Sequence, residues 1–407
     1  MTRTRYAVAP WLDGAPRKAR PAHPVLAQRL EVPIAIIGGG LTGAATAYVC
    51  AAAGLRVALL EADRIGHGAS GRGAGLIFQA PHVGFSDMEA LHGRRTAKAV
   101  WAAWRRAALD LSATVRRLNI RTGLTAADAL TWAQAGDVKR LEREHAARRA
   151  AGFEGTWLTG RALSRMRLHA AAGLRTRGDA TVDPLRLCQG FARAAGARGA
   201  AIFERTRAIA VSQLDGHVEV ESARGRVRCA TVIVAMGDPG DLFEPLARHV
   251  SACESYVVQT PPLPAAVRAT APDRTLILQD CRQPPHRLAW TAGDRILWAG
   301  ADKPRTPERL RQQTLVQRTG QLMYELSLVL PEISGIQPEY GWDAPYSVGR
   351  DGLLLVGPHR NYPRHLFALG LGTNPAAAFL ASRLLLRHAT GSLDKADEAF
   401  GFTRLSR

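Results

Sequence analysis

Apolar residues near the start of the chain form two short runs separated by a longer stretch of small residues. The first run covers residues 34–37 and the second covers 56–60, and the stretch between them, roughly 41–53, is followed by Gly54. Short apolar runs next to glycine are typical of buried strands, and a longer stretch that ends at glycine is typical of a helix. The pattern therefore predicts a strand, a helix and a second strand.

The remaining chain alternates in the same way towards its end and has a series of strand-like runs in the middle. Helices are predicted at about 86–118, 138–151, 184–197, 306–330 and 376–388. Strands are predicted at 201–204, 217–222, 229–235, 256–260, 276–279, 287–291, 295–299, 353–356 and 366–369. Ser86 and Glu89 have the spacing of a capping box at the start of the first of these helices. This order predicts an α/β fold with a domain assembled from separated segments.

The composition is that of a globular enzyme with room for two domains. The chain has 407 residues, of which 46% are hydrophobic, and no apolar run is long enough to predict a transmembrane helix. The basic N-terminus lacks the apolar stretch of a secretory signal. Five cysteines form no Cys-x-x-Cys pair. We therefore expect reduced thiols, no metal site and a cytoplasmic location.

The net charge of +19 comes almost entirely from arginine, since only five of the 54 basic residues are lysines. The arginines are scattered, with local pairs such as Arg94-Arg95 and Arg148-Arg149. No basic run is interleaved with the aromatic residues that single-stranded nucleic acid would need for stacking. We expect solvated helix faces that attract anions at low salt, and no nucleic-acid partner.

A glycine motif lies between the first predicted strand and its helix. Gly38 allows a tight turn, Gly40 lets the backbone approach a diphosphate, and Gly43 lets the helix pack close to the strand. The free N–H groups at the helix start would face the phosphates. Glu61, 18 residues beyond Gly43, can accept hydrogen bonds from a ribose. A glycine-rich turn in an unrelated α/β unit is the alternative, but the flanking strands favour a dinucleotide.

Further motifs follow this one in order along nearly the whole chain. They are Glu61-Ala62, the glycine-rich loop 68–75, Val182-Asp183-Pro184, the strand 232–237, the element 351–357 and the run 367–370. In this order they resemble the D-amino-acid oxidase superfamily of FAD-dependent oxidoreductases, which includes glycine, sarcosine and γ-glutamylputrescine oxidases. The resemblance implies FAD as the cofactor.

The resemblance also implies how the chain is organised. We expect a Rossmann-type FAD-binding domain (GR2-type flavoprotein) interleaved with an α+β substrate domain that carries a mixed β-sheet. The FAD-binding domain would comprise 31–90, 180–250 and 340–395, and the substrate or cap domain 91–179 and 251–339, with an N-terminal arm (1–30) and a tail (396–407). Residues expected to contact FAD are Gly38, Gly40, Leu41, Thr42, Gly43, Glu61, Ala62, Ser70, Gly71, Arg72, Gly73, Gly75, Ala208, Ala235, Gly237, Gly370, Gly372, Thr373 and Asn374.

Several positions depart from the pattern of the superfamily. Gly73 stands where relatives have Asn, and Pro375 stands where glycine is usual, which removes a backbone donor. The positions that match the covalently linking Cys and His of some relatives are Ala344 and Arg72, so we expect non-covalent FAD. Ala344 also stands where amino-acid oxidases carry the arginine that binds the substrate carboxylate. This favours secondary or extended amines over small D-amino acids, unless another arginine such as Arg287 has that role.

The resemblance implies that the C–N bond of an amine or amino acid is oxidised by hydride transfer to flavin. The imine would then hydrolyse, and oxygen or another carrier would accept the electrons. Candidate pocket residues are Tyr256, Trp290, Trp342 and Tyr346. Arg295 is expected near the reactive edge of the flavin, where a positive charge would stabilise the reduced ring.

Two other functions stay open at this point. The chain could be a flavoenzyme that acts on an amine attached to RNA, which the positive charge allows. It could also be a non-catalytic FAD-binding subunit of a larger complex, for which the departures at Gly73 and Pro375 are the motive.

Overall fold

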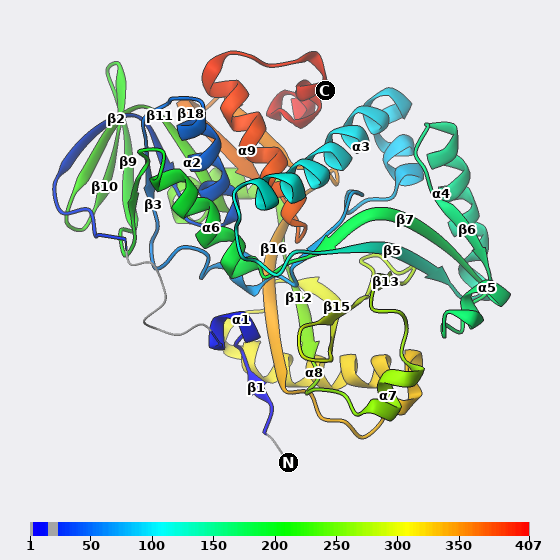
Figure 1. The fold of residues 1–407 in the computed structure, drawn as a ribbon. Helices are drawn as coiled ribbons and strands as arrows, with labels where there is room; N and C mark the ends of the chain where they lie inside the picture. Colours follow the sequence, from blue (N-terminus) through cyan, green and yellow to red (C-terminus); the bar gives the residue numbers. More distant parts are fainter. Residues whose placement is uncertain (1–2, 15–22, 407) are drawn as a thin grey trace.

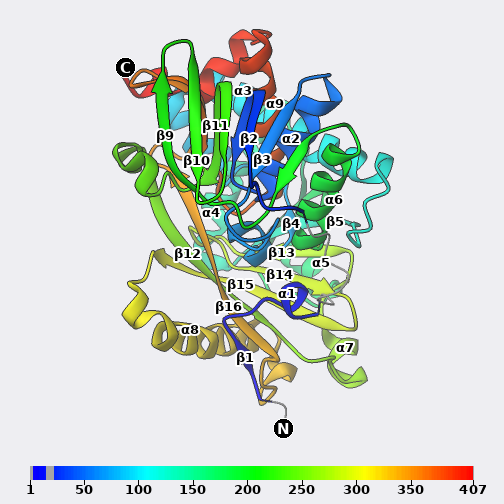
Figure 2. The same cartoon turned by 90° about the vertical axis from the view of Figure 1, so that its left-hand side faces the viewer.

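Figure 1 shows the computed structural model, which describes residues 3–14 and 23–406. Parts of the expected N-terminal arm (1–2 and 15–22) and the last residue of the tail lie outside the described residues. Two β-sheets stand next to each other, each with helices packed against it (Figures 1 and 2). Both sheets mix parallel and antiparallel strands.

The smaller sheet has eight strands in the described part of the chain. Their order is β17-β18-β11-β2-β3-β8, and β10 and β9 extend from β11 as antiparallel neighbours. The strands are β2 (Arg29–Ile37), β3 (Val57–Leu60), β8 (Ala201–Phe203), β9 (Ala208–Leu214), β10 (His217–Ser222), β11 (Arg226–Gly237), β17 (Leu355–His359) and β18 (Tyr362–Leu369). The parallel strands β11, β2, β3 and β8 all end at the same edge, where the glycine turn after β2 opens.

Three helices pack together on this sheet: α2 (Leu41–Ala52), α6 (Pro184–Gly196) and α9 (Pro375–Thr390). Ten of the twelve residues of α2 are buried. They are mostly alanine, glycine and threonine, and these small side chains let α2 approach both the sheet and the two other helices closely. Asp183 caps α6, because its carboxylate accepts the N–H of Arg186 at 2.9 Å.

The larger sheet has ten strands among the described residues, in the order β1-β16-β12-β15-β14-β13-β5-β7-β4, with β6 next to β7. The strands are β1 (Arg5–Tyr6), β4 (Leu76–Ile77), β5 (Thr125–Ala133), β6 (Thr156–Thr159), β7 (Ala172–Thr181), β12 (Val250–Gln259), β13 (Leu276–Gln279), β14 (Arg287–Thr291), β15 (Arg295–Pro304) and β16 (Tyr340–Gly349). The segment from 340 on thus begins in this sheet and continues into the smaller one with β17 and β18 (Figure 1).

The two faces of the larger sheet have different neighbours. Side chains alternate along a strand, so Leu288 and Trp298 point to one face, where they pack with residues of α8 (Glu308–Val329). Arg287 and its cross-strand partner Ala299 point to the other face. Figure 1 shows the smaller sheet and its helices on this second side. The second face is therefore where a ligand between the two sheets would lie.

Helix α3 (Phe85–Arg117) bends at Gly93, whose φ is 77°, and α4 (Val138–Ala150) packs beside it. The expected capping box of Ser86 and Glu89 is wrong, because the N-cap of α3 is Gly84, two residues before Ser86. Glu144 of α4 supplies the cap instead. Its carboxylate accepts the N–H groups of Phe85 and Ser86 at 2.7 and 2.8 Å.

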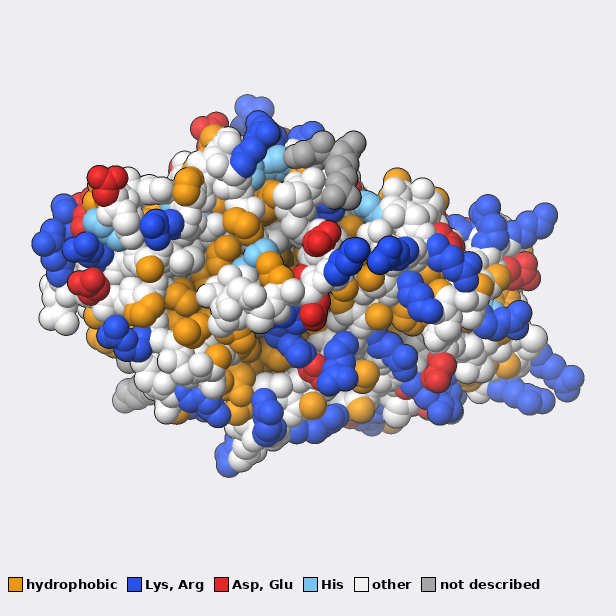
Figure 3. Space-filling view, turned by 90° about the horizontal axis from the view of Figure 1, so that it is seen from above, with side chains coloured by type: hydrophobic (Ala, Val, Ile, Leu, Met, Phe, Trp, Pro, Cys, Tyr) orange, Lys and Arg blue, Asp and Glu red, His pale blue; other side chains and the backbone are white. Residues whose placement is uncertain are grey.

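Basic side chains are distributed over the surface as the scattered arginines predict. Figure 3 shows Lys and Arg over most of the visible face, with acidic and apolar side chains between them. Arg94, Arg95, Arg106 and Arg116 of α3 are all exposed. No helix in the described ranges is long and apolar enough to cross a membrane.

We predict that Glu144→Gln destabilises the fold, since its carboxylate joins the start of α3 to Arg148, whose Nε lies 2.7 Å away. Burial would raise the pKa of Glu144, but Arg148 and the donors of Phe85 and Ser86 outweigh burial and lower it. Hydrogen bonds to a charged group contribute about 1.5–3 kcal/mol, so the urea midpoint should fall at pH 7.

The pH dependence of this effect has a definite sign. A pKa that is lower in the folded state gives stability that is present at neutral pH and lost as the pH falls through the folded pKa. The difference in free energy of unfolding between the variant and the native protein should therefore become smaller below about pH 4. Glu142→Gln, at an exposed position of the same helix, is the control. An equal effect of both substitutions would contradict the capping role.

Candidate functional site

The turn after β2 has no room for a side chain at Gly38 or at Gly43, for two different reasons. Gly38 has a φ of 105°, and a Cβ there would lie 2.7 Å from the carbonyl oxygen of Ala235. A Cβ on Gly43 would lie 1.8 Å from the oxygen of Gly38, so α2 can approach β2 only with glycine at this position. A Cβ on Gly40 would meet no backbone atom and only Ser70 Oγ, at 3.0 Å. Gly40 thus has the Ser70 side chain as its close neighbour, and it faces the space between the two sheets at the start of α2.

This space is a cavity of about 730 Å³ between the two sheets, within the size range of ligand pockets. All the residues expected to contact FAD line it except Gly43, Gly71, Arg72 and Gly370. The N-terminus of α2 opens into it through Gly40, Leu41 and Thr42, and the positive end of a helix suits a diphosphate. The cavity, the glycine turn and the helix start together fit a dinucleotide.

The four expected residues that do not line the cavity lie behind its lining, where they make close backbone contacts or an ion pair. Gly43 brings α2 to β2. Gly370 allows a close backbone contact, because a Cβ there would lie 2.5 Å from the nitrogen of Gly349. Gly71 and Arg72 belong to the short η2 helix (Ala69–Arg72), and the Arg72 side chain pairs with Asp343 at 2.7 Å.

Glu61 follows β3 at the edge of the cavity. Its carboxylate accepts the N–H of Gly39 at 2.6 Å and the N–H of Asp63 at 2.8 Å. Burial raises the pKa of Glu61, although both N–H donors act in the opposite direction. The side chain is thus fixed beside the glycine turn, where an acidic group can accept hydrogen bonds from a ribose.

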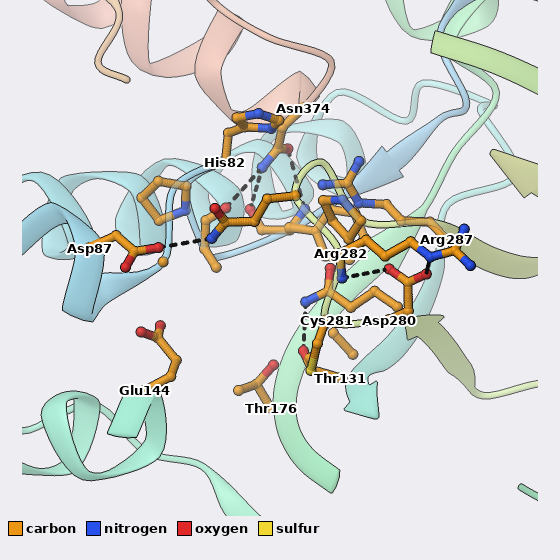
Figure 4. Close-up of a pocket in the computed structure, with 18 of the residues that line it drawn as sticks. His82, Asp87, Thr131, Glu144, Thr176, Asp280, Cys281, Arg282, Arg287 and Asn374 are labelled. Carbon is orange, nitrogen blue, oxygen red and sulfur yellow. Dashed lines mark hydrogen bonds and ion pairs between the residues drawn. The ribbon is translucent and has the colours of Figure 1, made fainter. Parts of the chain in front are cut away.

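A second, smaller cavity of about 130 Å³ adjoins the first. Residues 371–374 line both, so this loop is their common wall. The remaining walls of the smaller cavity come from β5, β7, β13 and β14, from α3 and α4, and from the loops 78–84 and 280–285. Figure 4 shows the lining side chains pointing inward from these elements.

The common wall is held by Asn374 at the start of α9. Its side-chain oxygen accepts the N–H of Ala376 at 3.0 Å, and its amide donates to the carbonyl of Phe78 at 2.8 Å. Pro375 occupies the first turn of α9. A proline is well placed there, because the N–H groups at this position have no partner inside the helix in any case.

Arg287 points into the smaller cavity without a balancing partner (Figure 4). Among the described residues no ion pair or hydrogen bond to its guanidinium is found, and its buried Nε has no acceptor. The guanidinium lies over the ring of Phe78, 5.1 Å from the ring centre. Burial lowers the pKa of Arg287, although the charge of Asp302 acts against this.

Tyr346 lies in the larger cavity and interacts with charged groups near the smaller one, Asp302 and Arg287. It lines the larger cavity, and its hydroxyl donates to Asp302 at 2.6 Å. Burial, and then the charge of Asp302, raise the pKa of Tyr346 well above its usual value. His82 lies nearby, with its ring centre 6.5 Å from that of Tyr346. Burial and then the charge of Arg287 lower the pKa of His82, so its imidazole is neutral at pH 7.

Polar side chains from three neighbouring strands, β5, β7 and β13, line the smaller cavity. The Gln279 amide donates to the Thr131 hydroxyl at 2.6 Å. Asp179 accepts the N–H groups of Gln79 at 2.7 Å and Ala129 at 3.2 Å. Burial raises the pKa of Asp179 to about 6, against the effect of these donors.

Tyr256, Trp290 and Arg295 are not brought to either cavity. The Tyr256 hydroxyl contacts Glu254 and Thr306, both at 3.0 Å. Trp290 packs in the apolar layer under α8. A substrate role for these residues stays a prediction without support from the two cavities.

Arg295 is the first residue of β15, at the end of the strand away from the two cavities. Its guanidinium is paired with Glu339 and also donates to the carbonyl of Thr260 at 3.2 Å. Trp342 lies outside the cavity lining too, and its indole donates to the carbonyl of Arg72 at 2.8 Å.

Sequence reasoning missed much of the smaller cavity. Phe78, Thr131, Asp179 and Gln279 belong to no motif, and β5 and β7 were not predicted as strands. The one available signal was the hydroxyl of Thr131 between the apolar Leu130 and Trp132.

The chain matches a known protein family over residues 33–386, and this family is described as FAD dependent oxidoreductase. It is similar to the probable oxidoreductase OrdL of Haemophilus influenzae, with 25% identity over 90% of this chain and 85% of that relative. It is also similar to the glycine oxidase of Bacillus licheniformis, with 25% identity over 88% and 90%. The γ-glutamylputrescine oxidoreductase of Escherichia coli is 24% identical over 78% and 74%.

Solved structures have the same fold. The glycine oxidase from Geobacillus kaustophilus has a TM-score of 0.75 and 21% identity, and the match covers 92% of this chain and 99% of that one. The L-proline dehydrogenase from P. horikoshii has a TM-score of 0.73 and 18% identity, with 94% and 99% covered. These likenesses confirm the predicted α/β fold.

We predict that Gly40→Val yields a folded protein without flavin. The new side chain meets no backbone atom of the protein and only the Ser70 side chain. Because Gly40 and Ser70 both line the cavity, valine takes up the space of the diphosphate. Flavin absorbance per protein measures the loss. Gly320→Val, at an exposed site in α8 with open space around it, should keep its flavin. A Gly40→Val protein that purifies with full flavin would show that the cavity is misassigned.

Proposed function

We propose that this chain, which belongs to the family of FAD-dependent oxidoreductases, oxidises the C–N bond of an amine that also carries a carboxylate. The observation that carries the proposal is Arg287, an unpaired cation in a small cavity that shares the wall 371–374 with the dinucleotide cavity. FAD, when bound, supplies the chemistry by accepting a hydride from the carbon next to the nitrogen.

The names of two relatives fit a substrate of this kind. Glycine and γ-glutamylputrescine, after which the relatives are named, each contain an amine and a carboxylate. Ala344 cannot bind a carboxylate, and Arg287 on the neighbouring part of the same sheet face has no ion-pair or hydrogen-bond partner among the described residues, although the charges of Asp302 and Asp280 act on it. This supports Arg287 as the arginine that binds the acidic group.

The protein's own contribution is electrostatic. A buried guanidinium without a partner is costly, and a carboxylate that forms hydrogen bonds with it removes this cost. The low polarity that lowers the pKa of His82 also favours a neutral substrate amine, the form that can lose hydride. The Tyr346 hydroxyl, whose proton is directed at Asp302, can accept an N–H of that amine through its oxygen.

The two alternative functions have less support. Pro375, one motive for a non-catalytic subunit, fits the start of α9 without loss of a helical hydrogen bond. Gly73 lines the larger cavity. On the face that Figure 3 shows, the basic side chains of the described residues are interspersed with acidic and apolar ones, which gives RNA binding no specific support.

A panel of amines tests the proposed reaction. Anaerobic addition should bleach the flavin with at least one amine that carries a carboxylate, and its methyl ester should react more slowly. Faster reduction by amines without an acidic group would contradict the proposal.

We predict that Arg287→Met weakens the reaction with the carboxylate substrate. Loss of one partner of a buried charge pair costs about 2–5 kcal/mol, which is about thirtyfold to several thousandfold in kcat/KM. The methyl ester of the same substrate should lose much less, because it brings no charge to the site. Stopped-flow reduction of the flavin measures both.

Arg295→Met is the matched control. Its native partner is Glu339, so both half-reactions should change by no more than about twofold, as for ordinary surface substitutions. Equal losses in the two variants would argue against a specific role for Arg287.

We further predict that FAD is bound non-covalently. The matching positions for a covalent link are Ala344, which lines the cavity but cannot react, and Arg72, which is paired with Asp343. Acid precipitation should therefore leave the yellow colour in the supernatant. Cys253 also lines the cavity, so colour in the pellet of the native protein but not of Cys253→Ser would reveal a link to this thiol and overturn the prediction.

A further inference from the structure

The N-terminal segment 5–13 packs on the larger sheet and precedes the dinucleotide motif in the chain. Its strand β1 pairs in parallel with β16, with Arg5 opposite Tyr340. The short helix α1 (Pro10–Asp13) follows and lies against the second face of that sheet (Figures 1 and 2). Asp13 is held by the hydroxyl of Tyr340 at 3.1 Å and by an ion pair with Arg5. We refer to residues 5–13 as the N-terminal strap.

Trp11 of the strap makes a direct contact with η2, the loop beside the dinucleotide cavity. Its indole N–H donates to the carbonyl of Gly71 at 2.6 Å. The indole of Trp342 donates to the next carbonyl, that of Arg72, at 2.8 Å. The two indole rings pack edge to face, 5.7 Å apart at an interplanar angle of 86°. Two successive carbonyls of η2 are thus bound by two tryptophans that also hold each other.

The position of η2 determines the shape of the diphosphate site. Ala69 and Ser70 line the larger cavity. Ser70 Oγ accepts the N–H of Leu41 at 2.9 Å, at the first residue of α2. The loop therefore lies directly over the helix N-terminus to which a diphosphate would bind, and a shift of η2 would open the cavity there.

The strap is anchored on the sheet through a few apolar residues, although most of its residues are exposed or half-buried. Ala9 is fully buried and, with Trp11, joins an apolar cluster that contains Leu297, Ala299 and Ala344. Ala344 also lines the cofactor cavity. The strap thus covers the part of the sheet face that continues into the flavin site.

We propose that the N-terminal strap is part of the cofactor site and retains FAD by holding η2 closed, with Trp11 as the positioning residue. The inference needs FAD binding but no particular substrate. Its test involves no turnover, so a failure of the amine panel would leave it untouched.

The test compares Trp11→Phe with the native holoenzyme. Phenylalanine keeps the ring contact with Trp342 but cannot donate to Gly71, whose carbonyl loses its partner. One such hydrogen bond corresponds to about a two- to tenfold change in an equilibrium constant. FAD release on dilution, followed by the rise of flavin fluorescence, should be faster by this factor. Trp11→Ala, which also removes the ring, should release FAD faster still.

Hydrogen exchange in the FAD-free proteins gives a second readout. The backbone amides of residues 70–73 should exchange faster in Trp11→Phe than in the native chain, whereas those of α8, on the opposite face of the sheet, should not change. A merely structural role would instead alter exchange in both regions.

Tyr6→Ala is the matched control, because Tyr6 is an aromatic residue of the same strap whose side chain is exposed. It should release FAD at the native rate. The proposal is overturned if Trp11→Phe releases FAD at the native rate, or if Tyr6→Ala accelerates release as much as Trp11→Phe does.

Discussion

The arrangement of the site depends on one close approach, that of α2 to the end of β2. A Cβ on residue 43 would lie only 1.8 Å from the oxygen of Gly38. Because residue 43 is glycine, the helix can begin directly behind the strand. Its small residues then let α6 and α9 pack against it. Because α9 is fixed by this packing, its first residues and Asn374 reach the same cavity as the start of α2. The contact between two glycines thus positions both the diphosphate site and the wall between the two cavities.

The larger sheet provides the other half of the site on a single face. Arg287 lies opposite Ala299, and Val257 lies opposite Trp342, all on this face. The strap covers one end, the cofactor cavity follows, and the smaller cavity lies at the other end. A slip of one residue in the register of β14 would exchange Arg287 with Leu288 and bury the charge under α8. The apolar packing under α8 therefore also orients the charge in the cavity.

How far the sequence predicted this site depended on the kind of signal. The glycine motif and strands such as 276–279 and 287–291 were predicted with the observed bounds, because local geometry and alternation determine them. Strands β5 and β7 were missed. They contain alanine, glycine and charged residues, which have low strand propensity. They exist because they pair with each other, and because β5 also pairs with β13 and β7 with β6. Since Thr131 and Asp179 lie on these strands, much of the smaller cavity could not be predicted.

The two arginines at the starts of β14 and β15 illustrate the same limit in the chemistry. Both occupy the same kind of position in strand-like runs, and the sequence favoured Arg295 as the residue near the flavin. Its partner Glu339 lies 44 residues further along the chain, a distance over which no local pattern is informative. Arg287 has no such partner and stays desolvated. Under the proposed function, the free-energy cost of desolvating Arg287 makes the site selective. An amine without an acidic group leaves the guanidinium unpaired, whereas a carboxylate forms hydrogen bonds with it.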